Sequence, residues 1–92
     1  MNLEIRYIEW TDSAGRAHWH DISAAKKLTP DSCKTIGFVL NETDDYIVVI
    51  QSHTNREDEA ENQADNALCI PKSAVSYMTA LFVGRSEAEL DG

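Results

Sequence analysis

Residues Leu68 to Leu81 read LCIPKSAVSYMTAL, and this stretch decides the fold. A short apolar strand ends at Pro71, which removes a backbone hydrogen-bond donor and forces the chain to turn. Ser73 and Ala74 are expected to form one 3₁₀ turn, after which a second apolar segment runs from Val75 to Val83. A strand, a proline turn and a second strand are typical of the end of a small, strongly bent β-barrel.

The first strand is predicted over Leu3 to Thr11, and it is apolar on both faces. Because side chains alternate along a strand, Ile8 and Trp10 share one face, while Ile5 and Tyr7 share the other. Such a strand is expected either inside a closed barrel or in contact with a neighbouring subunit.

A short helix is predicted after this strand, beyond a turn at Asp12 to Arg16. Asp21 can cap the helix, and Thr29-Pro30 ends it, because the residue before a proline is pushed out of the helical region. The apolar stripe of the helix comes from residues spaced by three, namely Trp19, Ile22, Ala25 and Leu28.

The centre of the chain predicts a β-hairpin. One strand covers Cys33 to Asn41, a turn follows, and a nearly continuous apolar strand covers Tyr46 to Ser52. Gly37, in the middle of the first of these strands, indicates a sharp bend or a close approach of another backbone.

Apolar character disappears from His53 to Asn66, a stretch rich in Asp, Glu and Asn. We expect either a flexible acidic loop that connects two strands or a short solvated helix from Glu57 to Gln63. The acidic tail from Gly84 to Gly92 is expected to fray.

These elements predict a mainly β fold: a five-stranded small β-barrel, SH3-like or Sm-like, with one short helix after the first strand. Closing the sheet would hide its edges. The 92 residues suffice for one domain, which we place at residues 1–83. Its core is thin, since a domain of this size buries only about 60–65 % of its unfolded surface. Association into a homo-oligomer would bury further surface and so compensate for the thin core.

Charge limits the classes of partner. Sixteen acidic residues against eight basic ones give a net charge of −8, and the basic residues are scattered. Binding to a long nucleic acid is therefore not expected, because it rests on clustered Lys and Arg. The acidic residues either solvate the surface or engage a basic partner. We expect no membrane contact, because no stretch approaches the length of a membrane span and the N-terminus lacks a signal-peptide pattern. We expect the protein in the cytoplasm, with Cys33 and Cys69 reduced.

Five short segments stand out along the chain: Trp10 to Ser13, Trp19, Thr35 to Val39, Asp45 to Val49, and Ile70 to Val75. Their order is similar to that in a group of small uncharacterised proteins of tailed bacteriophages and prophages, from about Ile8 to Leu81. The resemblance implies a viral or prophage accessory protein that acts inside a bacterial host cell. It carries over no catalytic or binding residues.

No pattern predicts catalysis. The serines and cysteines lie outside any nucleophile motif, and the glycines are isolated, so no phosphate loop is expected. His18 and His20 could bind a metal together with Asp21, Cys33 or His53, but histidines beside a core tryptophan are usually surface residues. We therefore predict no enzyme, no metal and no cofactor.

The candidate binding residues are aromatic and basic: Arg6, Tyr7, Trp10, Arg16, Trp19 and Lys72. Trp10 and Trp19 either fill the core or stack on a ligand. The favoured hypothesis is a non-catalytic, homo-oligomeric module that binds a host or viral protein, with counteraction of a host defence as one such role. The alternative is an oligomer that sequesters a small nucleotide held by a few basic residues. An Sm-type RNA binder is the third hypothesis, and the charge disfavours it.

Overall fold

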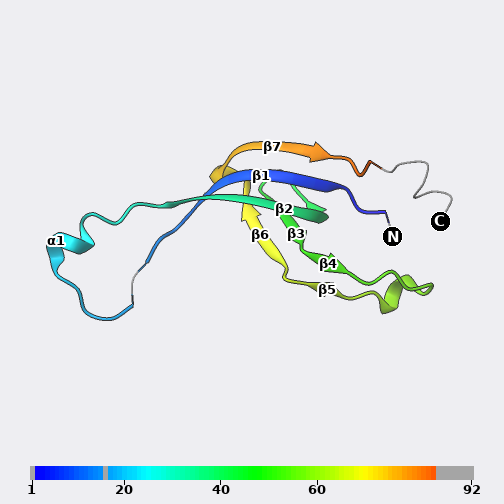
Figure 1. Ribbon diagram of the computed structural model, residues 1–92, viewed down its shortest axis with the longest axis horizontal. Helices are drawn as coiled ribbons and strands as arrows, with labels where there is room; N and C mark the ends of the chain where they lie inside the picture. The colour runs from blue at the N-terminus through cyan, green and yellow to red at the C-terminus, as the bar shows by residue number, and fades with distance from the viewer. Residues whose placement is uncertain (1, 16, 85–92) are drawn as a thin grey trace.

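The computed structural model describes residues 2–15 and 17–84. The fold is mainly β, with one five-stranded antiparallel sheet in the order β6-β3-β2-β1-β7 (Figure 1). Its strands are β1 (Ile5–Asp12), β2 (Asp31–Glu42), β3 (Tyr46–Ile50), β6 (Leu68–Pro71) and β7 (Val75–Leu81). All five predicted strands are therefore present, with bounds that differ by a few residues from those predicted.

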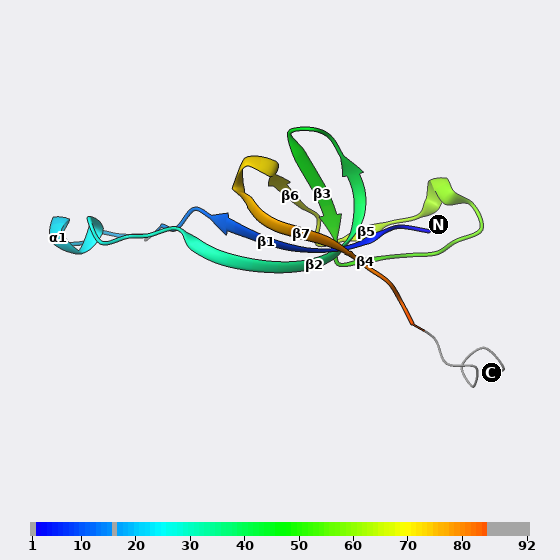
Figure 2. The same cartoon turned by 90° about the horizontal axis from the view of Figure 1, so that it is seen from above.

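The sheet bends along β2. The first part of this strand, Asp31 to Phe38, pairs with β1, and the last part, from Phe38 to Glu42, pairs with β3. A bulge between Val39 and Asn41 increases the twist of the second pairing. Figure 2 shows the result, with β3 and β6 rising away from the layer of β1, β2 and β7.

Gly37 lies at this bend, and the close approach predicted for it is confirmed. A Cβ added to Gly37 would lie 3.0 Å from the Cβ of Val49 and 3.1 Å from the carbonyl oxygen of Ile50. These distances are shorter than ordinary van der Waals contacts, so glycine lets β2 pass this close to β3 without displacing Val49 or Ile50.

The core fills the concave side of the bend. Ile8, Ile47 and Ile70, from β1, β3 and β6, are fully buried, and Val49 and Trp10 complete the cluster. Partly buried residues surround it, namely Cys33, Val39, Val75 and Met78. The core is thin, as predicted, so each of its large side chains carries much of the stability.

The sheet is not closed, so the predicted barrel is not confirmed. Among the described residues, β7 pairs only with β1, and β6 pairs only with β3. These two edge strands are joined by the 3₁₀ turn η2 (Lys72–Ala74), which confirms the predicted turn after Pro71. The backbone N–H of Lys72 donates to the carbonyl of Asp45, which ties this turn to the β2–β3 hairpin.

The acidic segment forms a small hairpin, which the sequence did not indicate. β4 (Ser52–His53) pairs with β5 (Ala64–Asp65), and the 3₁₀ turn η1 (Glu59–Glu61) lies between them. Its polar side chains satisfy the backbone: the hydroxyl of Thr54 accepts from the N–H of Gln63 at 2.8 Å. We call residues 52–65 the acidic hairpin.

The helix α1 (Ile22–Ala25) is present but lasts a single turn. It stands at the tip of an excursion between β1 and β2, residues 13–30, which we call the arm (Figure 1). Its apolar stripe is not buried: Trp19 is 99 % exposed and Ile22 is 75 % exposed. No helix within the described ranges has the length and apolar character needed to span a membrane.

Candidate functional site

An apolar surface covers the convex side of the sheet, opposite the core. The register places Ile36 of β2 beside Tyr7 of β1, and it places Phe38 and Leu81 on either side of Ile5. Directly paired residues point to the same side of a sheet. Together with Tyr77 they form a surface that we call the outer patch: Ile5, Tyr7, Ile36, Phe38, Tyr77 and Leu81.

The outer patch is partly open to solvent: Ile5, Tyr7 and Phe38 are half-buried, and the other three residues are exposed. Ile36 is 62 % exposed, Tyr77 is 53 % exposed, and Leu81 is 37 % exposed. The rings of Tyr7 and Tyr77 meet edge to face with their centroids 6.2 Å apart, a favourable aromatic geometry that orders both side chains. A contiguous exposed apolar surface with ordered tyrosines is typical of a protein contact surface.

Polar groups border one end of the outer patch. The hydroxyl of Tyr7 donates to Oε1 of Glu9 at 3.0 Å, and Lys34 lies opposite Glu9 on β2. Desolvation, followed by the hydrogen bond to Glu9, raises the pKa of Tyr7 above its ordinary value of 10.0. Tyr7 therefore keeps its proton at neutral pH and remains a donor.

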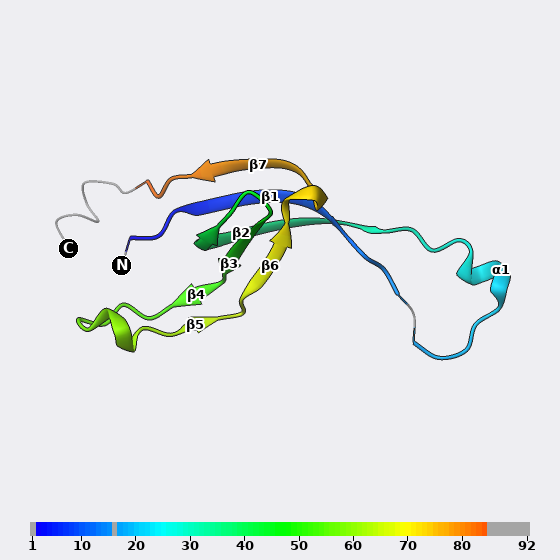
Figure 3. The ribbon, with the colours of Figure 1, turned by 180° about the vertical axis from the view of Figure 1, so that it is seen from behind.

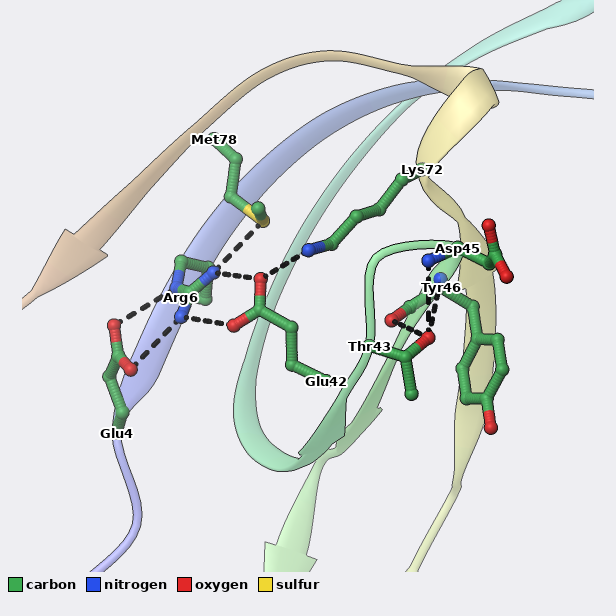
Figure 4. Close-up of polar contacts among 8 residues, drawn as sticks. All are labelled: Glu4, Arg6, Glu42, Thr43, Asp45, Tyr46, Lys72 and Met78. Carbon is green, nitrogen blue, oxygen red and sulfur yellow. Dashed lines mark hydrogen bonds and ion pairs between the residues drawn. The ribbon is translucent and has the colours of Figure 1, made fainter.

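A second feature, a charged cluster, lies at the edge of the concave side (Figure 4). The guanidinium of Arg6 contacts Glu4 at 2.9 Å and Glu42 at 3.1 Å, and it also reaches the sulfur of Met78 at 3.2 Å. Nζ of Lys72 lies 2.9 Å from the same Glu42. Two of the predicted binding residues, Arg6 and Lys72, are thus brought together around a carboxylate that the sequence did not point to.

Glu42 is held in this position by the turn that follows it. The hydroxyl of Thr43 accepts from the backbone N–H groups of Asp45 and Tyr46 at 3.2 and 3.1 Å (Figure 4). The N–H of Thr43 in turn donates to the carbonyl of Tyr46 at 2.9 Å. This closed turn fixes the end of β2, so that the side chain of Glu42 extends between Arg6 and Lys72.

The charges within the cluster compensate one another. Hydrogen bonds from Arg6, then from Lys72, lower the pKa of Glu42 to about 2, and the bonds to Glu4 and Glu42 raise the pKa of Arg6. The two cations face two carboxylates, and the side chain of Arg6 is only 11 % exposed. The cluster therefore clamps β1, the β2–β3 hairpin and η2 together.

The other predicted binding residues lie apart from the cluster. Trp10 lies in the core, 9 % exposed, and its Nε1 donates to the hydroxyl of Thr35 at 2.9 Å, which leaves little of its ring for a ligand. Trp19 is on the arm, and Tyr7 belongs to the outer patch. Arg16 lies outside the described residues.

The histidines are not gathered into a site. Nε2 of His20 contacts the carbonyl of Ala17 at 2.7 Å on the arm, whereas the ring of His53 packs against Phe38 with centroids 4.9 Å apart. Within residues 2–15 and 17–84, no three potential metal ligands of the His, Cys, Asp or Glu types come together.

Sequence reasoning missed Ile36, Tyr77 and Glu42. The sequence indicated two apolar faces only for the first strand, and the pairing register decides which residues of β2 and β7 lie beside them. For Glu42 the sequence carries no signal, because its partners Arg6 and Lys72 are distant along the chain.

Comparison with known proteins adds no relative: no family model matches the chain, and neither a curated protein nor a solved structure with significant similarity was found.

Proposed function

We propose that the protein is a non-catalytic binding module that associates with itself through the outer patch. The observation that carries this proposal is the exposure of Ile36 and Tyr77 on strands whose opposite faces form the core. Apolar side chains that remain in water do not stabilise a monomer, whereas a second copy placed on the patch would bury them.

The accessible area of the chain supports association. The chain exposes 7378 Å², whereas a compact protein of 10.3 kDa exposes about 5,400 Å². A standard protein–protein interface buries about 800 Å² on each partner, so the excess of about 2,000 Å² on one chain is more than such an interface needs. Part of the excess comes from the arm and the acidic hairpin, which extend the molecule to 61 × 29 × 28 Å.

The biological setting rests on the resemblance to phage and prophage proteins alone. In that setting the oligomer is an accessory protein that binds a host or viral protein in the bacterial cytoplasm. One role of such a protein is to counteract a host defence. An SH3-like or Sm-like relationship belongs to the same proposal. It is supported by the order of the five strands, in which the last strand lies beside the first.

The alternative, capture of a small nucleotide, gains no support from Arg6 and Lys72. Both cations are already paired with Glu42, and a phosphate would have to displace that carboxylate. An ultraviolet-absorbing molecule that co-purifies with the protein would reverse this preference.

The mass of the protein in solution tests the proposal. We expect sedimentation of the full chain to give a dimer or larger, and the double variant Ile36→Ser/Tyr77→Ser to dissociate at least about tenfold more readily. Both side chains are exposed, so circular dichroism should remain that of the wild type. Tyr46→Ser, at an exposed tyrosine on β3, is the matched control and should associate normally. A wild-type chain that stays monomeric at every concentration rules the proposal out.

A further inference from the structure

The arm carries apolar side chains that its own sheet leaves uncovered. Trp19, Ile22 and Leu28 are 99 %, 75 % and 41 % exposed, although their spacing is that of a buried helical stripe. A helix of one turn has no independent stability in water. A surface that covers these apolar side chains would therefore stabilise both the arm and its helix.

The charge of the arm identifies that surface. Residues 13–30 contain three basic residues, Arg16, Lys26 and Lys27, and one acidic residue, Asp21. The arm is thus a basic segment of a chain whose net charge is −8. A basic, apolar segment is attracted to an acidic surface that offers space for an aromatic side chain.

The acidic hairpin has these properties. Residues 52–65 contain one basic residue against five acidic ones, namely Glu57, Asp58, Glu59, Glu61 and Asp65. The hairpin is ordered by hydrogen bonds between Thr54 and Gln63, and beside those two residues it carries an open hollow of about 320 Å³. It therefore offers both charge complementarity and a place for an indole ring to pack.

The two segments of one chain lie too far apart to meet each other. The arm and the acidic hairpin stand at opposite ends of the 61 Å axis, with the sheet between them (Figures 1 and 3). Two copies placed antiparallel about a two-fold axis bring each arm to the acidic hairpin of the other copy. The same placement sets the two sheets against each other, since the sheet lies between the ends.

We propose that the arm of one copy packs on the acidic hairpin of a second copy, with Trp19 as its apolar anchor. This inference rests on the proposed self-association and adds to it a second contact, which is electrostatic. In a two-fold dimer the contact occurs twice, so a change in either segment acts on both ends of the assembly.

Charge reversal and its rescue test the contact. We expect Lys26→Glu/Lys27→Glu, and separately Glu57→Lys/Glu59→Lys, to weaken dimerisation of the full chain at least about tenfold at low salt. The chain carrying all four substitutions should regain the wild-type affinity to within about threefold, because the attraction is restored with opposite signs. Asp44→Lys, at the exposed β2–β3 turn, is the control and should leave dimerisation unchanged.

Salt and fluorescence give two further readouts. The wild-type dimer should weaken when NaCl is raised from about 50 to about 500 mM, and the variants with one reversed segment should lose most of this dependence. The emission of Trp19, obtained as the difference between wild type and Trp19→Phe, should shift to shorter wavelength on dimerisation, because the ring leaves water.

The outcomes separate this contact from the outer patch. If Ile36→Ser/Tyr77→Ser abolishes dimerisation while the charge reversals and the emission of Trp19 show no effect, the arm contact is wrong and the proposed function stands. Failure of the four-fold variant to recover affinity also overturns the arm contact. A chain that never associates overturns both.

Discussion

β1 presents two apolar faces to two different surroundings. Ile8, on one face, is fully buried beneath β3 and β6, whereas Tyr7, one residue earlier, belongs to a patch partly open to solvent. The two faces are equally apolar in sequence, and the difference arises because β2 bends and carries β3 and β6 over one side only. An apolar face in the sequence therefore marks a surface whose burial is stabilising. The topology decides whether the chain itself buries that surface.

The largest effect on stability is expected from a comparison of two isoleucines that lie on the two opposite faces of the sheet. Ile8→Ala should lower the free energy of unfolding by about 2–5 kcal/mol, because it empties part of a thin core. Ile36→Ala should change it by no more than about 0.5 kcal/mol when the chain is monomeric, because Ile36 is 62 % exposed. Urea denaturation at low protein concentration measures both values. Equal losses at the two positions would mean that the outer patch is part of the core.

Gly37 offers a test of the bend that creates the two faces. Gly37→Ala should cost about 1–3 kcal/mol, since its Cβ would meet the Cβ of Val49 and the carbonyl of Ile50, neither of which can swing away. Gly15→Ala is the matched control: a Cβ there has nothing within 4 Å, and no described glycine has a positive φ. It should be neutral or stabilise by up to about 1 kcal/mol. A neutral Gly37→Ala, measured in the same denaturation series, would argue against the close approach of β2 and β3.

The smallest effect concerns the charged cluster that clamps the bend from the concave side. The pKa of Glu42 is lowered to about 2 from its usual 4.5, so the stabilisation is complete above about pH 4.5 and is lost as pH falls toward 2. Because the side chain of Glu42 is 31 % exposed, we expect about 1 kcal/mol. Thermal unfolding of wild type and Glu42→Gln should differ at neutral pH and converge near pH 2. If the two unfolding temperatures differ by the same amount at every pH in this range, the charge of Glu42 does not stabilise the bend.

Much of the fold follows from local patterns. The alternation in residues 33–41 and the apolar run after Tyr46 predicted the central hairpin, and Pro71 predicted the turn η2. Gly37 was identified for the reason that the structure confirms. These features depend on backbone chemistry within a few residues, which a single sequence displays directly.

The predictions that failed concern features that depend on the surroundings of an element. The stripe from Trp19 to Leu28 predicted a helix that packs, but the arm has no packing partner in its own chain, and only one helical turn remains. The acidic hairpin has no apolar pattern at all. Its order comes from hydrogen bonds of Thr54, Asn62 and Gln63, which hydropathy does not register.

The candidate site shows the same division. The sequence indicated that β1 is apolar on both faces and singled out Tyr7, Arg6 and Lys72. It did not reveal that Arg6 and Lys72 share Glu42, because that contact depends on the turn after β2 and on the position of η2. Nor did it separate the two tryptophans, of which Trp10 lies in the core and Trp19 is exposed on the arm.

The base of the arm has a consequence for how firmly the arm is joined to the sheet. The last pair of the β1–β2 ladder sets Asp12 opposite Asp31, and like charges that face each other across two strands repel. We expect this rung to open more readily than the uncharged pairs deeper in the ladder, which would loosen the junction between the arm and the sheet. A loosened junction would let the exposed ring of Trp19 meet a partner from more than one direction before the two surfaces settle together.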